Sequence, residues 1–177
     1  MKSLLSGERI YLSGFHEKDT AKIKDWNDHE ELQRLLDALP YKPKTDEEVK
    51  KWINDSGSNF IRFAVRLREN DEIIGYAEIE GILWSHRVGW ITIAIGDKSY
   101  WGNGYGKEIL QRLLAYGFNE LNLHRLQLTV FDYNKRAINL YESLGFKQEG
   151  TFREFLRRDG KRHNMLLYGL LHSEWKN

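Results

Sequence analysis

The sequence predicts a single mixed α/β domain, built on a mostly antiparallel central sheet of about seven strands with helices around it. Three observations lead to this fold class. The chain has 177 residues, which is the length of one ordinary domain. No linker, low-complexity run or internal repeat divides residues 1–177. The hydrophobic pattern also switches several times between the period of strands and the period of helices.

The first third of the chain is predicted to hold one short strand and three helices. The strand covers residues 8–13, where apolar and polar residues alternate. Helices follow over 17–27 and 30–38, the second marked by leucines spaced three and four residues apart. Thr45 and Glu48 have the spacing of a capping box, which predicts the start of a third helix.

The middle of the chain is predicted to form an antiparallel meander. Alternating apolar and polar residues predict strands over 63–67, 73–82 and 88–95. The connection at 69–71 is a short turn, and consecutive strands with short connections pair antiparallel.

Helices and strands alternate in the second half. Helices are expected over 104–121 and 134–144, each with one apolar stripe, and Gly145 has the position of a helix-ending residue. A turn at Asp159-Gly160 joins the last two strands. The remaining strands are expected over 125–131, 151–157 and 162–170. The order β-β-β-α-β-α-β-β, behind an N-terminal strand and helices, is that of a mixed sheet.

Composition argues against several classes of function. Lys and Arg number 27 and Asp and Glu 26, whereas proteins that bind nucleic acid carry a clear basic excess. The chain has no Cys, and its six His lack metal-ligand spacing, so no metal is expected. No run approaches the roughly 20 apolar residues of a membrane-spanning helix, and the N-terminus lacks a secretory apolar core. A cytoplasmic protein without a membrane partner is expected.

Three glycines at alternate positions, Gly102, Gly104 and Gly106, separate the strand over 88–95 from the helix that follows. Glycine lets the backbone approach a ligand closely, and the free N–H groups of a helix start favour a diphosphate. The spacing does not fit a P-loop, because Glu108 stands where Ser or Thr is needed. It does not fit the dinucleotide pattern either, because the third glycine comes one residue early. Taken alone, the cluster is better explained as a flexible loop.

A second motif spans residues 134–146 and contains an Asn-capped amphipathic helix with a glycine stop. Tyr141 lies on the same stripe as Ala137, Ile138 and Leu144. Taken alone, Tyr141 is therefore explained as a core residue.

The two motifs together, in this order and with these flanking elements, resemble the GNAT superfamily of acyl-CoA-dependent N-acetyltransferases. The family pattern Q/R-x-x-G-x-G/A corresponds to residues 101–106, with Trp101 where the family has Gln or Arg, so backbone contacts are expected to dominate there. The later family signature corresponds to Asn134, Tyr141, Gly145 and Phe146. Within the superfamily, the chain looks most similar to the branch of ribosomal-protein N-terminal acetyltransferases and spermidine N-acetyltransferases. The residues that carry this finer likeness are 122–126, 149–150 and 159–164.

This resemblance implies a GNAT-like fold and an enzyme that transfers the acetyl group of acetyl-CoA to a primary amine by direct attack in a ternary complex. The implied acceptor is a protein N-terminus, a small amine or a polyamine, and a homodimer is expected. The pantetheine of the cofactor would lie between the strands at 91–95 and 125–131. The residues expected to bind acetyl-CoA are Ile93, Ala94, Ile95, Trp101, Gly102, Asn103, Gly104, Tyr105, Gly106, Lys107, Asn134 and Lys135.

The resemblance also gives Tyr141 the role of proton donor to the departing thiolate. An alkyl amine is mostly protonated at neutral pH and must lose a proton before it attacks. Glu78, in the middle of the strand over 73–82, is the candidate proton acceptor, and Glu80 on the same strand face is its substitute. Lys107, Lys135 and Arg136 are candidate contacts for the phosphates.

Two other functions remain as alternatives: a non-catalytic acyl-CoA-binding module, and a dinucleotide-binding oxidoreductase, which the glycine spacing disfavours. Trp84, His86 and Arg87 either line the acceptor entrance or merely cover the sheet. A polyamine acceptor would require several carboxylates at the entrance. The candidates for such a cluster are Glu30, Glu31, Asp37, Glu78 and Glu80.

Overall fold

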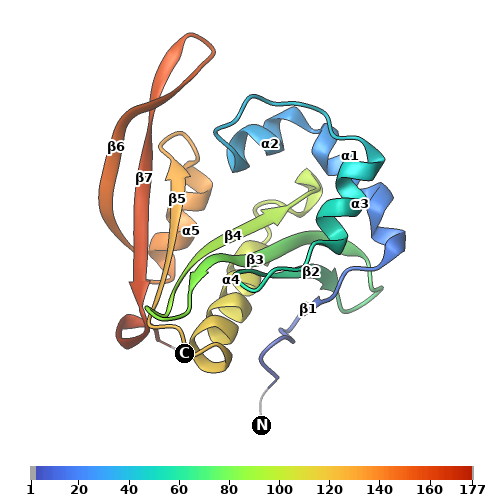
Figure 1. Ribbon diagram of the computed structural model, residues 1–177, viewed down its shortest axis with the longest axis horizontal. Coiled ribbons are helices and arrows are strands. Elements are labelled where there is room, and N and C mark those ends of the chain that lie inside the picture. Colours follow the sequence, from blue (N-terminus) through green and yellow to red (C-terminus); the bar gives the residue numbers. More distant parts are fainter. Residues whose placement is uncertain (1–2, 177) are drawn as a thin grey trace.

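The structure, a computed structural model, describes residues 3–176; Met1, Lys2 and Asn177, which the predicted domain includes, lie outside the described residues. Figure 1 shows a central sheet with helices on both of its faces. The strands are β1 (Ile10–Ser13), β2 (Ile61–Leu67), β3 (Ile73–Leu83), β4 (Val88–Ile95), β5 (Arg125–Phe131), β6 (Lys147–Arg158) and β7 (Lys161–Leu171). The α-helices are α1 (Thr20–Asp28), α2 (Glu30–Leu36), α3 (Asp46–Asn54), α4 (Tyr105–Ala115) and α5 (Lys135–Ser143). Across residues 3–176, no helix is long and apolar enough to span a bilayer.

All of the strands belong to one seven-stranded sheet with the order β1-β2-β3-β4-β5-β7-β6. Neighbouring strands run antiparallel except for β4 and β5. The meander from β2 to β4 and the closing hairpin of β6 and β7 have the predicted connectivity. The predicted fold class, a mixed and mostly antiparallel sheet flanked by helices, is therefore confirmed.

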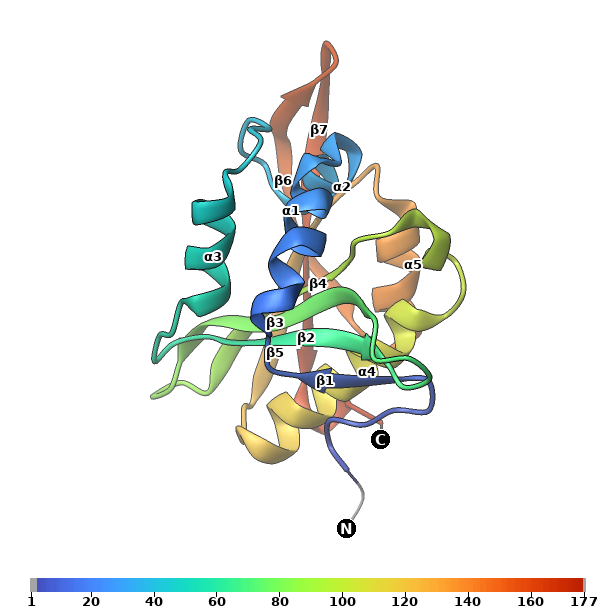
Figure 2. The ribbon, with the colours of Figure 1, turned by 90° about the vertical axis from the view of Figure 1, so that its right-hand side faces the viewer.

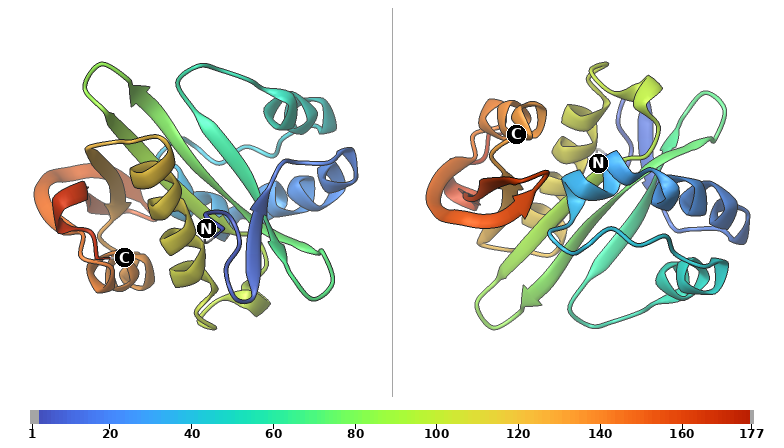
Figure 3. Two further views of the ribbon diagram at one scale, coloured as in Figure 1. Left: turned by 90° about the horizontal axis from the view of Figure 1, so that it is seen from below. Right: turned by 90° about the horizontal axis from the view of Figure 1, so that it is seen from above.

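The one parallel pair gives the sheet its distinctive shape. β4 and β5 are paired only where Val88–Trp90 lies beside Arg125–Gln127. Beyond these residues the strands continue to Ile95 and Phe131 while moving apart (Figures 1 and 3). The sheet therefore has two arms that meet at one end. Where β4 and β5 have diverged, the backbone N–H and C=O groups that face the gap form no hydrogen bonds between these two strands.

The helices pack on opposite faces of the sheet (Figure 2). α4 lies on one face, where its buried side chains join the larger hydrophobic cluster with residues from most strands. α1 and α3 lie on the other face and form a smaller cluster with β2 and β3. The α4 residues of the larger cluster are Ile109, Leu110, Leu113 and Leu114. The smaller cluster contains Ile23, Trp26, Leu32, Val49, Ala64 and Ile73.

Most elements begin and end within about three residues of their predicted bounds, and two differ more. The helix expected over 104–121 is α-helical only to Ala115 and continues as a π-helical segment, Tyr116–Glu120. Gly117 in this segment packs so closely that a Cβ would lie 2.9 Å from a methyl carbon of Leu126. β6 begins at Lys147, earlier than the predicted residue 151. It is an edge strand with most side chains exposed, so the alternation that marks a half-buried strand is absent.

Glu108 of α4 anchors the start of the sheet to this helix. Its Oε1 accepts hydrogen bonds from the backbone N–H groups of Arg9 (2.7 Å) and Ile10 (3.3 Å). Its Oε2 accepts from Nε of Arg9 at 3.1 Å. Burial by itself would raise the pKa of this carboxyl, but these donors outweigh burial and lower the pKa below its usual value.

We expect Glu108→Gln to lower the free energy of unfolding at pH 7 by about 1–2 kcal/mol, the scale of lost charge-assisted hydrogen bonds. A carboxyl with a lowered folded-state pKa stabilises the fold above its unfolded pKa, and this stabilisation is lost as pH falls through the folded value. The difference between variant and parent should therefore shrink below about pH 4. Urea unfolding at several pH values measures it, and a pH-independent difference would contradict the ionic origin.

Candidate active site

A cavity of about 280 Å³ lies between the diverging strands β4 and β5, under α2 and beside α5. Both motifs singled out in the sequence contribute to its walls. The predicted cofactor residues that line it are Ile93, Ala94, Ile95, Trp101, Gly102, Gly104, Gly106, Lys107 and Asn134, and Tyr141 lines it as well. Other lining residues include Leu32, Leu35, Leu36, Thr92, Thr129, Arg136 and Leu140.

The glycine loop forms one end of this cavity. Gly102 and Gly104 have φ values of 76° and 85°, in the left-handed region that side chains rarely adopt. Gly104 is the N-cap of α4, so the N–H groups of the first helical turn lie at the loop without partners earlier in the helix. A Cβ on Gly106 would lie 3.1 Å from a methyl carbon of Leu140, so the loop packs closely against α5. This geometry fits a diphosphate.

Trp101 and Arg136 meet at the same end of the cavity. The indole Nε1 of Trp101 donates a hydrogen bond to the carbonyl oxygen of Ile95 at 2.8 Å. The guanidinium of Arg136 lies over the indole ring, 3.9 Å from its centroid. Within residues 3–176 this guanidinium forms no hydrogen bond or ion pair, and burial lowers its pKa. This cation next to the loop therefore still has its hydrogen-bonding capacity free for an anion.

Tyr141 lies on α5 where the helix faces the cavity. Asn134 caps this helix, because its Oδ1 accepts a hydrogen bond from the N–H of Ala137 at 3.2 Å. The Tyr141 ring packs edge-to-face against Phe146, and its hydroxyl has no hydrogen-bond partner among residues 3–176. Burial raises the pKa of Tyr141 to about 12. The phenol therefore keeps its proton at neutral pH, as a proton donor must.

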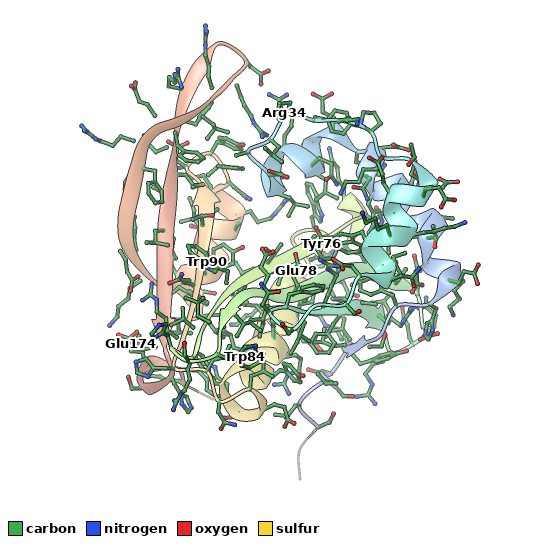
Figure 4. All side chains as sticks on the ribbon, viewed as in Figure 1. Arg34, Tyr76, Glu78, Trp84, Trp90 and Glu174 are labelled. Carbon is green, nitrogen blue, oxygen red and sulfur yellow. The ribbon has the colours of Figure 1, made fainter. Side chains whose placement is uncertain are left out.

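Glu78 is buried on the face of β3 that lies beneath α1–α3 (Figure 4). Its Oε2 accepts a hydrogen bond from Nε of Arg62 at 2.6 Å, and the same guanidinium donates to the carbonyl oxygen of Trp52 at 2.8 Å. Burial raises the pKa of Glu78, and the Arg62 charge opposes this rise. Glu78 lies outside the cavity lining.

Glu80 lies two residues further along β3 and lines a second, open groove of about 370 Å³. Its Oε1 accepts a hydrogen bond from the Thr92 hydroxyl at 3.3 Å. The groove shares Leu36, Ile91, Thr92 and Thr129 with the larger cavity, so the two spaces are continuous.

α2 forms the roof over both spaces, a role that the sequence did not indicate. Its leucine stripe was expected, but the spacing of leucines cannot tell whether they face a core or a cavity. Arg158 of the β6–β7 hairpin donates hydrogen bonds to the carbonyl oxygens of Arg34 and Asp37, at the C-terminal end of α2. The Tyr133 hydroxyl also donates to the Arg34 carbonyl, at 2.8 Å. Arg34 is labelled above the sheet in Figure 4.

Several predicted residues lie away from the cavity lining. Asn103 is turned toward the protein, with its Nδ2 donating to the carbonyl of Ser99 at 3.0 Å. The ring of Tyr105 packs against Tyr100 and under the guanidinium of Arg9. Lys135 is exposed and is not among the lining residues. Of the loop residues left open, Trp84 donates a hydrogen bond to the carbonyl of Ser58 at 2.7 Å and lines neither space.

Residues 3–176 contain no group of three or more His, Cys, Asp or Glu side chains arranged to hold a metal ion. The shape of the sheet and the residues of the cavity together define a particular class of protein. A sheet that splits beside a glycine loop and a buried tyrosine is suited to bind an extended, phosphate-bearing acyl donor in the gap.

Comparison with known proteins agrees with this class. A sequence model of the acetyltransferase (GNAT) domain matches residues 9–147, so the chain belongs to the GNAT acetyltransferase family. It is an acetyl-CoA-dependent N-acetyltransferase, which transfers an acetyl group to an amine. The fold and function expected from the resemblance are confirmed.

Individual relatives differ in what they acetylate. The spermidine N(1)-acetyltransferase of Vibrio cholerae is 28% identical over 171 residues, covering 96% of each chain. The ribosomal protein uS5-alanine N-acetyltransferase of Escherichia coli is 27% identical, covering 98% of this chain and 93% of that protein. A crystal structure of the Vibrio cholerae spermidine N-acetyltransferase with CoA and spermine superposes with a TM-score of 0.85 at 25% identity, covering 97% of this chain and 100% of that one.

Proposed function

We propose that residues 1–177 act as one catalytic domain that binds acetyl-CoA in the cavity between β4 and β5 and transfers its acetyl group directly to a bound primary amine. One observation supports this arrangement most strongly: the cavity walls bring together the glycine loop, the free edge of β4 and Tyr141. The loop N–H groups would hold the diphosphate, and the free edge of β4 at Ile93 and at the N–H of Ile95, whose carbonyl oxygen already accepts from Trp101, would pair with the pantetheine amides.

The proposed reaction needs two proton transfers. As the C–N bond forms and the C–S bond breaks, Tyr141 would donate its proton to the sulfur. The position of Tyr141 in the cavity wall supports this role, and burial, which raises its pKa to about 12, keeps the hydroxyl protonated before the transfer. The prediction that Glu78 accepts the proton of the amine stays untested. Glu78 is ion-paired with Arg62 and lines neither the cavity nor the groove, whereas Glu80 lines the groove, so Glu80 is the better-placed carboxylate.

The decisive experiment is release of free thiol from acetyl-CoA by the purified protein. The acceptors would be peptides with free N-termini, spermidine, spermine and an aminoglycoside, each beside a blank without acceptor. We expect release that depends on the acceptor. Thermal stabilisation by acetyl-CoA without release for any amine would favour the non-catalytic binding module instead.

We also propose a cytoplasmic homodimer. Support for the dimer comes from β6, an edge strand on which Phe152 and Phe155 are each about half exposed. An edge strand with exposed aromatic side chains is a surface that commonly pairs with another chain. Light scattering coupled to gel filtration measures the oligomeric state, and a monomer at micromolar concentration would exclude the proposed dimer.

Arg136 provides a specific test of cofactor binding. We expect Arg136→Ala to weaken acetyl-CoA binding about 10-fold or more, because a charge-assisted hydrogen bond is worth about 1.5–3 kcal/mol. Arg136→Lys should retain part of the affinity, and Arg157→Ala, on the exposed edge strand, is the matched control. Calorimetric titration measures all three. Equal affinities for the Arg136→Ala variant and its parent would show that this guanidinium does not contact the cofactor.

A further inference from the structure

The open groove beside the acetyl-CoA cavity has the composition of a binding site for an amine. Glu80 on β3 and Trp90 on β4 lie directly opposite each other in the strand register. The indole of Trp90 lies over Gly81, where a Cβ would be 3.1 Å from the ring, and Trp90 and Glu80 both line the groove. Thr92 and Thr129 add hydroxyl groups at the junction with the cavity. A carboxylate, an aromatic face and hydroxyls together suit an alkylammonium group.

The carboxylates that could form a larger anionic site are mostly neutralised by partners. Glu78 is paired with Arg62, and Glu31 of α2 with Lys98. Glu30 is paired with Arg34 at 3.4 Å. Paired charges contribute little net potential to a neighbouring groove. Among the described residues that line the groove, Glu80 is the one with a carboxylate side chain, and it forms no ion pair within residues 3–176.

The roof of the site contributes positive charge. The guanidinium of Arg158 lies over the ring of Phe131, 5.5 Å from its centroid, and donates to main-chain carbonyls of α2. Among residues 3–176, no carboxylate is ion-paired with it. A second ammonium on an extended acceptor would therefore approach a cation. Asp37, a carboxylate without an ion pair among residues 3–176, lies at the end of α2 next to the same guanidinium, which offsets its charge, and its Oδ1 accepts a hydrogen bond from the N–H of Leu39.

The sheet floor beyond the groove is largely apolar. The strand register shows which residues of β5, β7 and β6 lie on the same face of the sheet as Thr129. They are Phe131, Met165, Leu167 and Phe152. Phe152 is half exposed on this face, so the floor offers apolar area to the part of an acceptor that follows its amine.

We propose that this groove binds the acceptor through a single ammonium, held by Glu80, Trp90 and Thr92, and selects amines whose adjoining body is uncharged and apolar over polyamines. This inference rests on the proposed acetyl transfer and names its substrate class. A peptide α-amine or an arylalkylamine has the required chemistry. Spermidine and spermine do not, even though spermidine acetyltransferases are among the relatives.

Glu80 also has a chemical role in this site. The ammonium gives one proton to the Glu80 carboxylate, which passes it to solvent, and the free amine then attacks the thioester carbonyl carbon. The C–N bond forms and the C–S bond breaks. The second proton lost from nitrogen balances the proton that Tyr141 gives to sulfur, so one proton is released per transfer.

The test compares kcat/KM for an uncharged dipeptide amide with a free α-amine, phenylethylamine, spermidine and spermine. We expect the two monocationic amines to exceed both polyamines by about 10-fold or more. Higher kcat/KM for spermidine or spermine would overturn the inference while supporting acetyl transfer. Failure of every amine, with acetyl-CoA still bound, would instead contradict the proposed function.

Substitutions distinguish the role of Glu80 from that of Glu78, the other carboxylate on this face of β3. Glu80→Gln should lower kcat/KM for the dipeptide amide about 100-fold, within the range of lost acid–base catalysis. Trp90→Ala should raise KM for phenylethylamine more than it changes kcat. Glu47→Gln, on an exposed turn of α3, is the isosteric control. Parental kinetics in Glu80→Gln, with the defect appearing in Glu78→Gln, would overturn the assignment to Glu80.

Discussion

Tyr141→Phe is expected to lower kcat about 100-fold or more, with the KM for acetyl-CoA within about twofold of the parent value. The hydroxyl lines the cavity and has no hydrogen-bond partner among residues 3–176, so its removal leaves no buried polar group unsatisfied. The phenylalanine ring keeps the packing against Phe146. What the variant loses is the proton donor, a contribution of about 100- to 10,000-fold.

Tyr168→Phe is the matched control for this variant. Tyr168 is also buried, and its hydroxyl donates to Glu142 at 2.8 Å, outside the cavity. The Tyr168→Phe variant should therefore lose stability and keep its kcat.

The pH dependence of kcat gives a second check. Because burial raises the pKa of Tyr141 to about 12, a basic limb between pH 8 and 10 in the parent profile should persist in Tyr141→Phe. Steady-state kinetics across this range decide the point, and an undiminished kcat in Tyr141→Phe would remove the residue from the mechanism.

The second large effect is expected from Gly104→Val, which should weaken acetyl-CoA binding about 5- to 30-fold. Gly104 has φ of 85°, and a β-branched residue adopts this conformation only with strain. A strained residue would shift the loop whose N–H groups face the cavity. A loss of about 1–2 kcal/mol corresponds to a factor of about 5 to 30 in affinity.

Gly160→Val supplies the control, because Gly160 has a similar φ of 79° but lies in the β6–β7 turn, away from the loop. Both variants should be less stable than the parent, and calorimetry should find weakened cofactor binding only in Gly104→Val. If both variants bound acetyl-CoA equally, the loop conformation would not control binding.

Elements with strong local signals were predicted well. The capping box of α3 is present, with Thr45 and Glu48 bonded reciprocally at 3.2 and 2.7 Å. Gly145 ends α5 with φ of 92°, as its position indicated. These features depend on residues within a few positions of one another. The extent of β6 depends instead on pairing with β7, and an exposed edge strand leaves little hydrophobic pattern.

The site residues also fall into those with a local sequence signal and those without one. The glycine loop and Tyr141 belong to short motifs, so the sequence was enough to nominate them. The pairing of Glu78 with Arg62 depends on the register of β2 against β3, which the sequence did not specify. The leucines of α2 and the guanidinium of Arg158 act through contacts between distant segments. Such contacts leave no local pattern in the sequence.

The contacts that hold the roof helix also bear on how the protein folds. Arg158 is 124 residues from Arg34 and 121 from Asp37, so the last hairpin of the chain fastens a helix from its first quarter. Contacts between such distant segments carry a large loop-closure entropy and slow folding. During synthesis, the hydrogen bonds from Arg158 that fasten the roof helix cannot form until the hairpin has emerged. Enzymatic activity should therefore appear after the bulk of the secondary structure during refolding, and Arg158→Ala should reduce that delay along with the final activity.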